Sequence, residues 1–68
     1  MPYKAAKVRR ALAKRFRELR QRGSHTMFRV GGETRVFSYH DRDELADRQL
    51  RRVAADFGLT LDELKSLL

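Results

Sequence analysis

The 68-residue chain contains no cysteine, no tryptophan and only one proline, Pro2. Without cysteine it forms neither disulfide bonds nor a thiolate metal site. No apolar run approaches the roughly 18 residues that a membrane-spanning helix requires, so we expect no membrane partner. The basic N-terminal segment lacks the apolar stretch of a secretory signal, and we therefore expect a cytoplasmic protein.

The length of the chain predicts one small domain that covers residues 1–68. A domain of this size buries only about 60% of the surface that its unfolded chain exposes. Two helices packed against a small sheet are therefore the largest core that we expect such a chain to build.

Basic residues are in excess, and they are concentrated in one part of the chain. The net charge is +7 at pH 7. Residues 1–24 carry nine Lys and Arg residues against Glu18 alone, residues 25–40 carry a net charge of +1, and residues 41–68 carry −2. Because the positive charge is segregated rather than mixed, it indicates a nucleic-acid partner more than a merely solubilising surface.

The first third of the chain has the apolar spacing of a helix. The apolar positions are Ala5, Val8, Leu12, Phe16 and Leu19. Taken alone, this periodicity predicts one helix that runs to about Leu19, and Gly23 is a suitable residue to end it.

The middle third alternates between apolar and polar residues, as strands do. Gly31-Gly32 separates two alternating runs and predicts a hairpin, since glycine readily adopts the positive φ of tight turns. A two-residue turn sets three cross-strand pairs: Val30–Glu33, Phe28–Arg35 and Thr26–Phe37. The core face then contains Phe28, Val30, Phe37 and Tyr39, and the opposite face contains His25, Met27, Val36, Ser38 and His40.

The last third has the pattern of two short helices. Leu50, Val53, Ala54 and Phe57 fall on one helical face, and Gly58 is suited to end that helix. An acidic cluster before it suits a helix N-terminus, and its members are Asp41, Asp43, Glu44 and Asp47. The spacing of Thr60 and Glu63 predicts a capping box, and a final helix follows with Leu61, Leu64 and Leu68 facing inward.

Gly23-Ser24-His25 follows two arginines, Arg20 and Arg22, and this combination has the residue types that RNA cleavage requires. RNA carries its own nucleophile, the 2′-hydroxyl. Imidazole suits the proton transfers because its ordinary pKa of about 6.5 lies near neutral pH. Guanidinium suits phosphate because it is always charged and binds in a bidentate manner. Composition alone also fits a plain Gly-Ser turn followed by a polar strand residue.

The order of these features resembles the HicA family of bacterial toxins, from about Val8 to Leu67. The resemblance is carried by Arg20-Gln21-Arg22-Gly23-Ser24-His25, the two-stranded stretch, His40, Leu45, Leu50 and Ala55-Asp56-Phe57-Gly58-Leu59-Thr60. It implies an α+β fold like that of double-stranded-RNA-binding domains: a helix, a three-stranded antiparallel sheet and a helix, here with a short C-terminal helix. It makes residues 16–21 a strand. We prefer this to the helical interpretation, because a lone two-stranded hairpin is marginal.

The resemblance implies an mRNA interferase, that is, the endoribonuclease toxin of a type II toxin–antitoxin pair, neutralised by a HicB-type antitoxin protein. The family's catalytic histidine corresponds to His25. We expect Ser24 to orient the imidazole or the substrate and Gly23 to permit the tight turn. His40 is a second candidate for proton transfer, although a strand-end surface histidine fits it equally well.

We expect the phosphates of mRNA to contact basic residues on either side of the site. These residues are Arg20 and Arg22 beside His25, and Lys7, Arg10 and Lys14 on the first helix, which we expect to steer the RNA. No metal and no cofactor are expected, because helix-start chemistry explains the acidic cluster better than metal ligation does.

Two alternatives without catalysis stay open. Val53 to Leu67 fits helix-turn-helix spacing, although the second helix offers Asp62, Glu63 and only Lys65 to a nucleic acid. The other alternative is a non-catalytic RNA-binding domain of the same fold, in which His25 only contacts phosphate.

Overall fold

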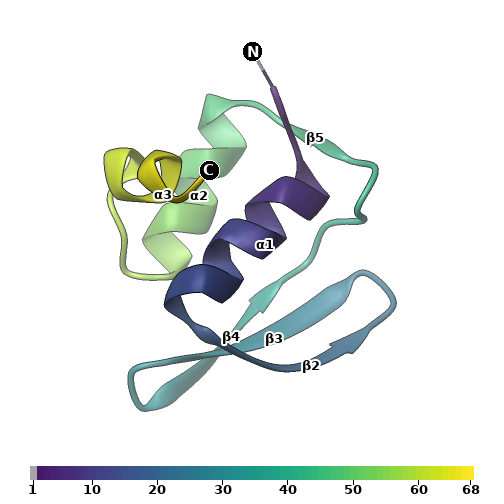
Figure 1. The fold of residues 1–68 in the computed structure, drawn as a ribbon, viewed down its shortest axis with the longest axis vertical. Coiled ribbons are helices and arrows are strands. Elements are labelled where there is room, and N and C mark those ends of the chain that lie inside the picture. Colours follow the sequence, from purple (N-terminus) through teal and green to yellow (C-terminus); the bar gives the residue numbers. More distant parts are fainter. Residues whose placement is uncertain (1) are drawn as a thin grey trace.

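A computed structural model describes residues 2–68 of the chain and contains three helices and two small sheets (Figure 1). In chain order, the elements are β1 (Tyr3–Lys4), α1 (Ala5–Arg15), β2 (Arg17–Arg22), β3 (His25–Val30), β4 (Glu33–Phe37), β5 (Glu44–Leu45), α2 (Asp47–Asp56) and α3 (Leu61–Leu67). Strands β2, β3 and β4 form an antiparallel sheet in that order, and β1 pairs with β5. The predicted order of helix, three-stranded antiparallel sheet, helix and short C-terminal helix is confirmed.

The first helix ends four residues earlier than its apolar periodicity predicts. Phe16 donates the last helical hydrogen bond, to the carbonyl of Leu12, but its own backbone is extended at φ −123° and ψ 153°. The prediction of a helix through Leu19 is therefore wrong. The strand expected over residues 16–21 is confirmed, and it is β2, Arg17–Arg22. Leu19 is the only apolar residue of β2, so as a helix this segment would bury little apolar surface, whereas β3 offers it backbone partners.

The β3–β4 hairpin has the predicted register. The pairs Val30–Glu33, Phe28–Arg35 and Thr26–Phe37 all occur, and Gly31 at the turn has a φ of +62°. Thr26, Phe28 and Phe37 are buried beneath the helices. The predicted core face is thus confirmed within the strands, because a two-residue turn leaves only one pairing that buries both phenylalanines.

Strand β4 ends at Phe37, before the alternation predicted as far as His40 is complete. Tyr39 still packs toward the core, with its ring centroid 5.4 Å from that of Phe37. His40 lies in a turn closed by Asp43, whose carboxylate accepts from the His40 N–H at 2.9 Å and whose N–H donates to the His40 carbonyl. This turn takes the chain away from the sheet, so the sheet face predicted for His40 is not realised.

The acidic cluster before α2 is dispersed, and only Asp47 lies in the first turn of that helix. Asp41 pairs with Arg9, Asp43 closes the turn at His40, and Glu44 pairs with Lys4 across the β1–β5 ladder. The helix-start interpretation is therefore wrong for three of the four carboxylates, because Arg9 and Lys4, far away in sequence, engage Asp41 and Glu44, while a local turn engages Asp43.

The two helices of the C-terminal third end and begin as the sequence predicts. Gly58 follows α2 with a φ of +70°, and the N–H of Leu59 donates a hydrogen bond of 2.8 Å to the carbonyl of Ala54. Thr60 Oγ1 accepts from the N–H of Glu63, while the Glu63 carboxylate accepts from the N–H of Thr60. The backbone hydrogen bond from Thr60 holds the pKa of Glu63 below its ordinary value.

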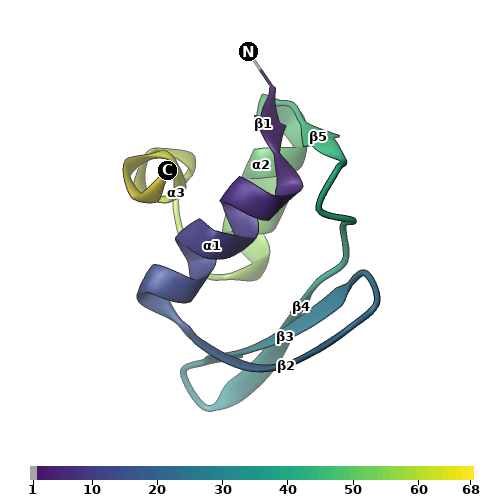
Figure 2. The same cartoon turned by 45° about the vertical axis from the view of Figure 1, so that its right-hand side comes forward.

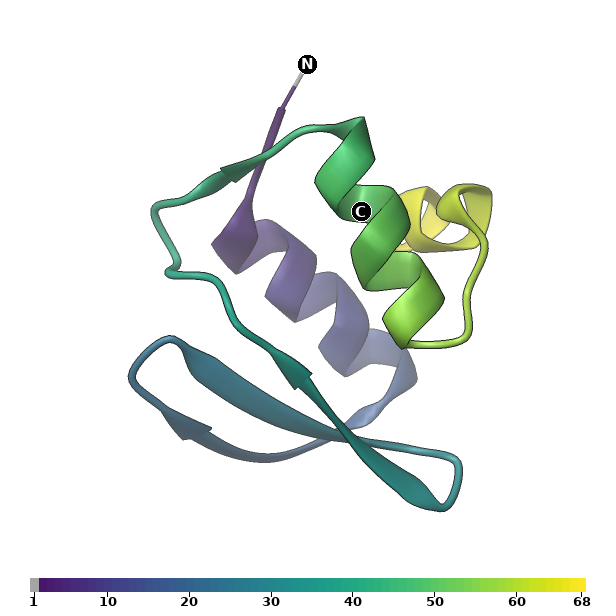
Figure 3. The same ribbon diagram turned by 180° about the vertical axis from the view of Figure 1, so that it is seen from behind.

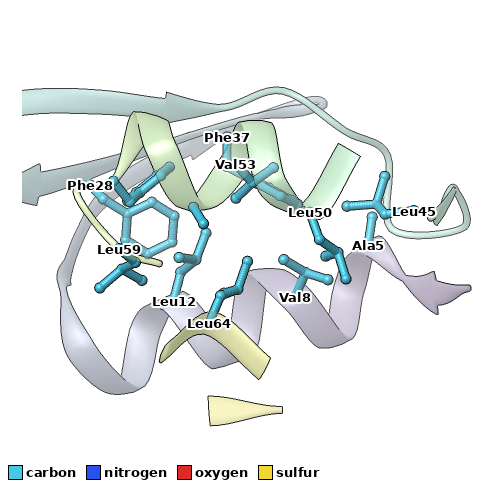
Figure 4. Packing of buried hydrophobic residues seen from close by; sticks show 12 residues of the cluster. Ala5, Val8, Leu12, Phe28, Phe37, Leu45, Leu50, Val53, Leu59 and Leu64 are labelled. Atoms are coloured by element: carbon cyan, nitrogen blue, oxygen red, sulfur yellow. The ribbon is translucent and has the colours of Figure 1, made fainter. Parts of the chain in front are cut away.

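All three helices lie on one side of the three-stranded sheet (Figures 1 and 2). Figure 4 shows the core between these layers, where Val8 and Leu12 of α1 meet Leu50 and Val53 of α2. Helix α3 packs on α1 and α2 and inserts the buried Leu64. Because the helices cover only one face of the sheet, the other face is open to solvent (Figure 3).

Candidate functional site

A β-bulge in β2 determines which side chains reach the open face of the sheet. Arg17 pairs with Arg29 and Glu18 pairs with Phe28, but the next pair joins Arg20 to Met27. Leu19 is therefore the extra residue of the bulge. Since Glu18 and Phe28 face the helices, the paired positions on either side of them face outward. Beyond the bulge, Arg20 and Arg22 return to the same face as Arg17.

The open face combines arginines with His25 and has no acidic residue. Its members, by register, are Arg17, Arg20, Arg22, His25, Met27, Arg29, Thr34 and Val36. We call this set the open sheet face. All of its members are exposed apart from the half-buried Met27.

Both acidic residues of the sheet lie on the other face, where basic residues pair with them. Glu18 is 3.9 Å from Arg9 of α1, and Glu33 is 2.6 Å from Arg35. Arg35 also donates to the carbonyl of Asp56 at the end of α2. Within residues 2–68, the four arginines of the open sheet face have no carboxylate within salt-bridge distance. The sheet therefore presents concentrated, uncompensated positive charge on one side.

His25 is the first residue of β3 and pairs directly with Arg22, the last residue of β2. Gly23 and Ser24 form the two-residue turn between them, and Gly23 has a φ of +58°. Directly opposed residues on neighbouring strands have Cβ atoms about 5 Å apart. The turn thus holds an imidazole and a guanidinium side by side at one end of the open sheet face, and Ser24 is half-buried beside them.

The second histidine, His40, is exposed in the turn after β4 and is not a member of the sheet. Its backbone is held by Asp43, as described above. No strand pairing aligns it with His25 in the part of the chain that the structure describes. The proton-transfer role of His40 stays a prediction.

The basic residues predicted on the first helix lie away from the open sheet face, because α1 covers the opposite face (Figure 2). Lys14 donates to the carbonyl of Leu67 at 3.0 Å, and the Lys7 ammonium lies 5.8 Å from the centre of the Tyr3 ring. Arg10 is exposed. The sheet therefore brings Arg20, Arg22 and His25 together, but it does not bring the α1 residues to them.

Sequence analysis missed Arg17 and Arg29, the pair at the other end of the open sheet face from His25. Arg29 lies two residues after Met27 in the predicted hairpin and so shares its face, which means that the alternation contained its signal. Arg17 could not be placed in this way, since its alignment with Arg20 and Arg22 depends on the bulge.

Two surface hollows lie beside α2, away from His25. One of about 270 Å³ opens between β4 and α2 and is lined by residues that include Val36, Tyr39, Arg52 and Phe57. A second, of about 290 Å³, adjoins it at Tyr39 and Arg52 and is also lined by Arg48 and Gln49. Neither hollow is lined by His25 or Ser24.

Residues 2–68 contain no group of three or more histidine or acidic side chains arranged to hold a metal ion. No described helix is long and apolar enough to span a bilayer.

Helix α3 presents little positive charge of its own. Lys65, its only basic residue, is paired with Asp47 of α2 at 3.1 Å, and Asp62 and Glu63 are exposed. A helix with this charge is repelled by a phosphate-lined groove. The helix–turn–helix arrangement of α2 and α3 is therefore better explained as core packing than as DNA reading.

Searches of protein families, of curated proteins and of solved structures found no match to this chain. The resemblance to HicA toxins accordingly stays a prediction that rests on the residues named above.

Proposed function

We propose that this protein is an endoribonuclease that cleaves mRNA without a metal, with His25 as the general acid or base. One observation carries the proposal: His25 is paired with Arg22 across a tight turn, at the end of a sheet face that bears four arginines and no carboxylate. A proton-transfer group and a phosphate-binding group are thereby adjacent on a surface that attracts polyanions.

The reaction uses the nucleophile that RNA supplies. The 2′-oxygen attacks the adjacent phosphorus and loses its proton to a base, while the bond from phosphorus to the 5′-oxygen breaks and that oxygen gains a proton. The products are a 2′,3′-cyclic phosphate and a 5′-hydroxyl end. His25 takes part in one of these proton transfers, and the guanidinium of Arg22 stabilises the additional negative charge on the phosphoryl oxygens.

A cleaving activity against mRNA would harm the cell that makes it. Together with the resemblance to HicA toxins, this supports a role as the toxin of a type II toxin–antitoxin pair whose HicB-type antitoxin covers the site. A gene for such an antitoxin next to the gene for this chain is the expected genomic arrangement.

The test is cleavage of a labelled mRNA by the purified protein in the presence of EDTA. We expect cleavage to persist, and we expect His25→Ala to reduce its rate by about 10²- to 10⁴-fold, the usual contribution of general acid–base catalysis. His40→Ala, measured in parallel, shows whether the second histidine contributes. Full activity of His25→Ala, or loss of wild-type cleavage on chelation, would contradict the proposal.

The second candidate is a non-catalytic RNA-binding module of the same fold. It is favoured by the position of His40 outside the sheet, which leaves His25 as the only histidine among the described residues of the open sheet face. In that case the wild-type protein binds RNA without cleaving it, and His25→Ala weakens binding only slightly.

A further inference from the structure

We propose that the open sheet face is a track for the phosphate backbone of single-stranded RNA, in which Arg17 and Arg29 bind phosphates distant from the cleaved bond. This inference rests on the proposed function and specifies how that site holds its substrate. It gives a role to two residues that the cleavage site itself does not require.

The register arranges the open sheet face in three rows. Arg17 and Arg29 form the first row, Arg20 and Met27 the second, and Arg22 and His25 the third. Strands rise about 3.3 Å per residue, so Arg17 and Arg22 are separated by roughly 15 Å along β2. An RNA backbone that is bound along β2 contacts an arginine in every row and reaches His25 at one end.

Electrostatics favour an anion in every row. The four arginines have no carboxylate within salt-bridge distance among residues 2–68, and a bound anion would relieve their mutual repulsion. On the helix side, by contrast, Arg9 and Arg35 are neutralised by Glu18, Asp41 and Glu33. The free positive charge of the sheet is therefore on the face that the helices leave uncovered.

The open sheet face offers no aromatic ring on which bases could stack. Phe28 and Phe37 both point toward the helices, and Met27 and Val36 occupy the middle row instead. Stacking on aromatic side chains is the usual source of affinity for bases in single-strand binders. Without it, affinity comes from phosphate contacts, and binding should tolerate different sequences and depend strongly on salt.

A single strand is the occupant because the cleavage chemistry requires it. The 2′-oxygen must line up opposite the leaving 5′-oxygen, and the A-form duplex holds it out of that alignment. A flexible strand adopts the in-line geometry beside His25 while Arg17, Arg20 and Arg29 hold the neighbouring phosphates.

The test is fluorescence anisotropy with a labelled 2′-O-methyl RNA of roughly 12 nucleotides, which covers the site size of a small module and lacks the nucleophile. Each phosphate contact contributes about 0.7 to the slope of log K against log salt for single strands, so four arginines predict a slope of about −3. The double variant Arg17→Gln with Arg29→Gln should reduce the slope to about −1.4.

The matched control is Arg42→Gln with Arg51→Gln, which removes the same charge from exposed positions in a turn and on α2. We expect its slope to equal that of the wild type. Equal losses in both double variants would overturn the track, since they would show that only net charge matters. An unchanged slope in the Arg17 and Arg29 variant would also overturn it, as would tighter binding of the same RNA annealed into a duplex.

The two proposals fail in different ways. Because the 2′-O-methyl RNA cannot be cleaved, a wild-type protein that binds it through Arg17 and Arg29 but never cleaves mRNA would contradict the proposed nuclease and keep the track. A protein that cleaves mRNA while its Arg17 and Arg29 variant binds with the full slope would contradict the track alone.

Discussion

At the scale of single residues, the position of His25 depends on Gly23. The turn between β2 and β3 has only two residues, and Gly23 occupies the left-handed region at φ +58°. Side chains other than those of Gly, Asn and Asp are strained there by roughly 1–2 kcal/mol. The pairing of Arg22 with His25 closes this turn, so strain at Gly23 acts directly on the candidate site.

We expect Gly23→Ala to lower the free energy of unfolding by about 1 kcal/mol and to slow RNA cleavage, because the strained turn displaces Arg22 from His25. The space around Gly23 is open, so no clash contributes to this effect. Urea unfolding and cleavage rates measure both quantities. Gly23→Asn is the matched control, since Asn tolerates a positive φ. This variant should retain most of the stability and most of the cleavage rate. An equally impaired Asn variant would show that something other than backbone strain is at work.

At the scale of elements, the bulge in β2 decides the composition of the open sheet face. Without an extra residue, strict alternation from Arg17 would turn Arg20 and Arg22 toward the helices. The extra residue, Leu19, turns both arginines back to the open sheet face, next to the candidate site. Bulges often redirect side chains in this way near functional sites.

Deletion of Leu19 tests this interpretation of β2. Removing the extra residue leaves Glu18 facing the helices and keeps Arg20 and Arg22 outward, so we expect the variant to fold and to keep its salt-dependent RNA binding. Deletion of Gln21, which pairs with Thr26, should instead misalign Arg22 with His25 and impair cleavage. Circular dichroism establishes folding of both variants. A folded Leu19 deletion that has lost RNA binding would contradict the assignment of the extra residue.

At the scale of the whole molecule, Phe57 joins the helical layer to the sheet. Its ring centroid lies 5.5 Å from that of Phe16, where α1 ends, and 5.5 Å from that of Phe28 in β3. Phe57 is almost fully buried. A domain of this size has a free energy of unfolding of only roughly 3–10 kcal/mol. The position of the open sheet face relative to the helices therefore depends on very few large side chains.

Phe57→Ala should cost about 3–5 kcal/mol, a large fraction of the total stability, because it removes the ring that contacts both layers. We expect a strongly lowered thermal unfolding midpoint and, as a consequence, reduced RNA binding. Phe57→Leu keeps much of the apolar volume and should cost less. A midpoint unchanged in the alanine variant would show that the two layers are held together by other contacts.

Local sequence patterns predicted the structure correctly wherever it depends on residues that are close together in the sequence. The β3–β4 register follows from alternation around Gly31-Gly32, and the caps at Gly58 and Thr60 follow from short-range backbone geometry. His25 and Arg22 could be singled out for the same reason, since they flank one tight turn.

The remaining features depend on partners far away in the chain. Residues 17–22 form a strand because β3 satisfies their backbone, and Asp41 and Glu44 leave the helix start because Arg9 and Lys4 attract them. The alignment of Arg17 with Arg20 and Arg22 depends on a bulge, which is set by pairing between strands and not by any local preference. Residue types and turns thus determine which groups the protein has, and tertiary pairing determines which of them share a face.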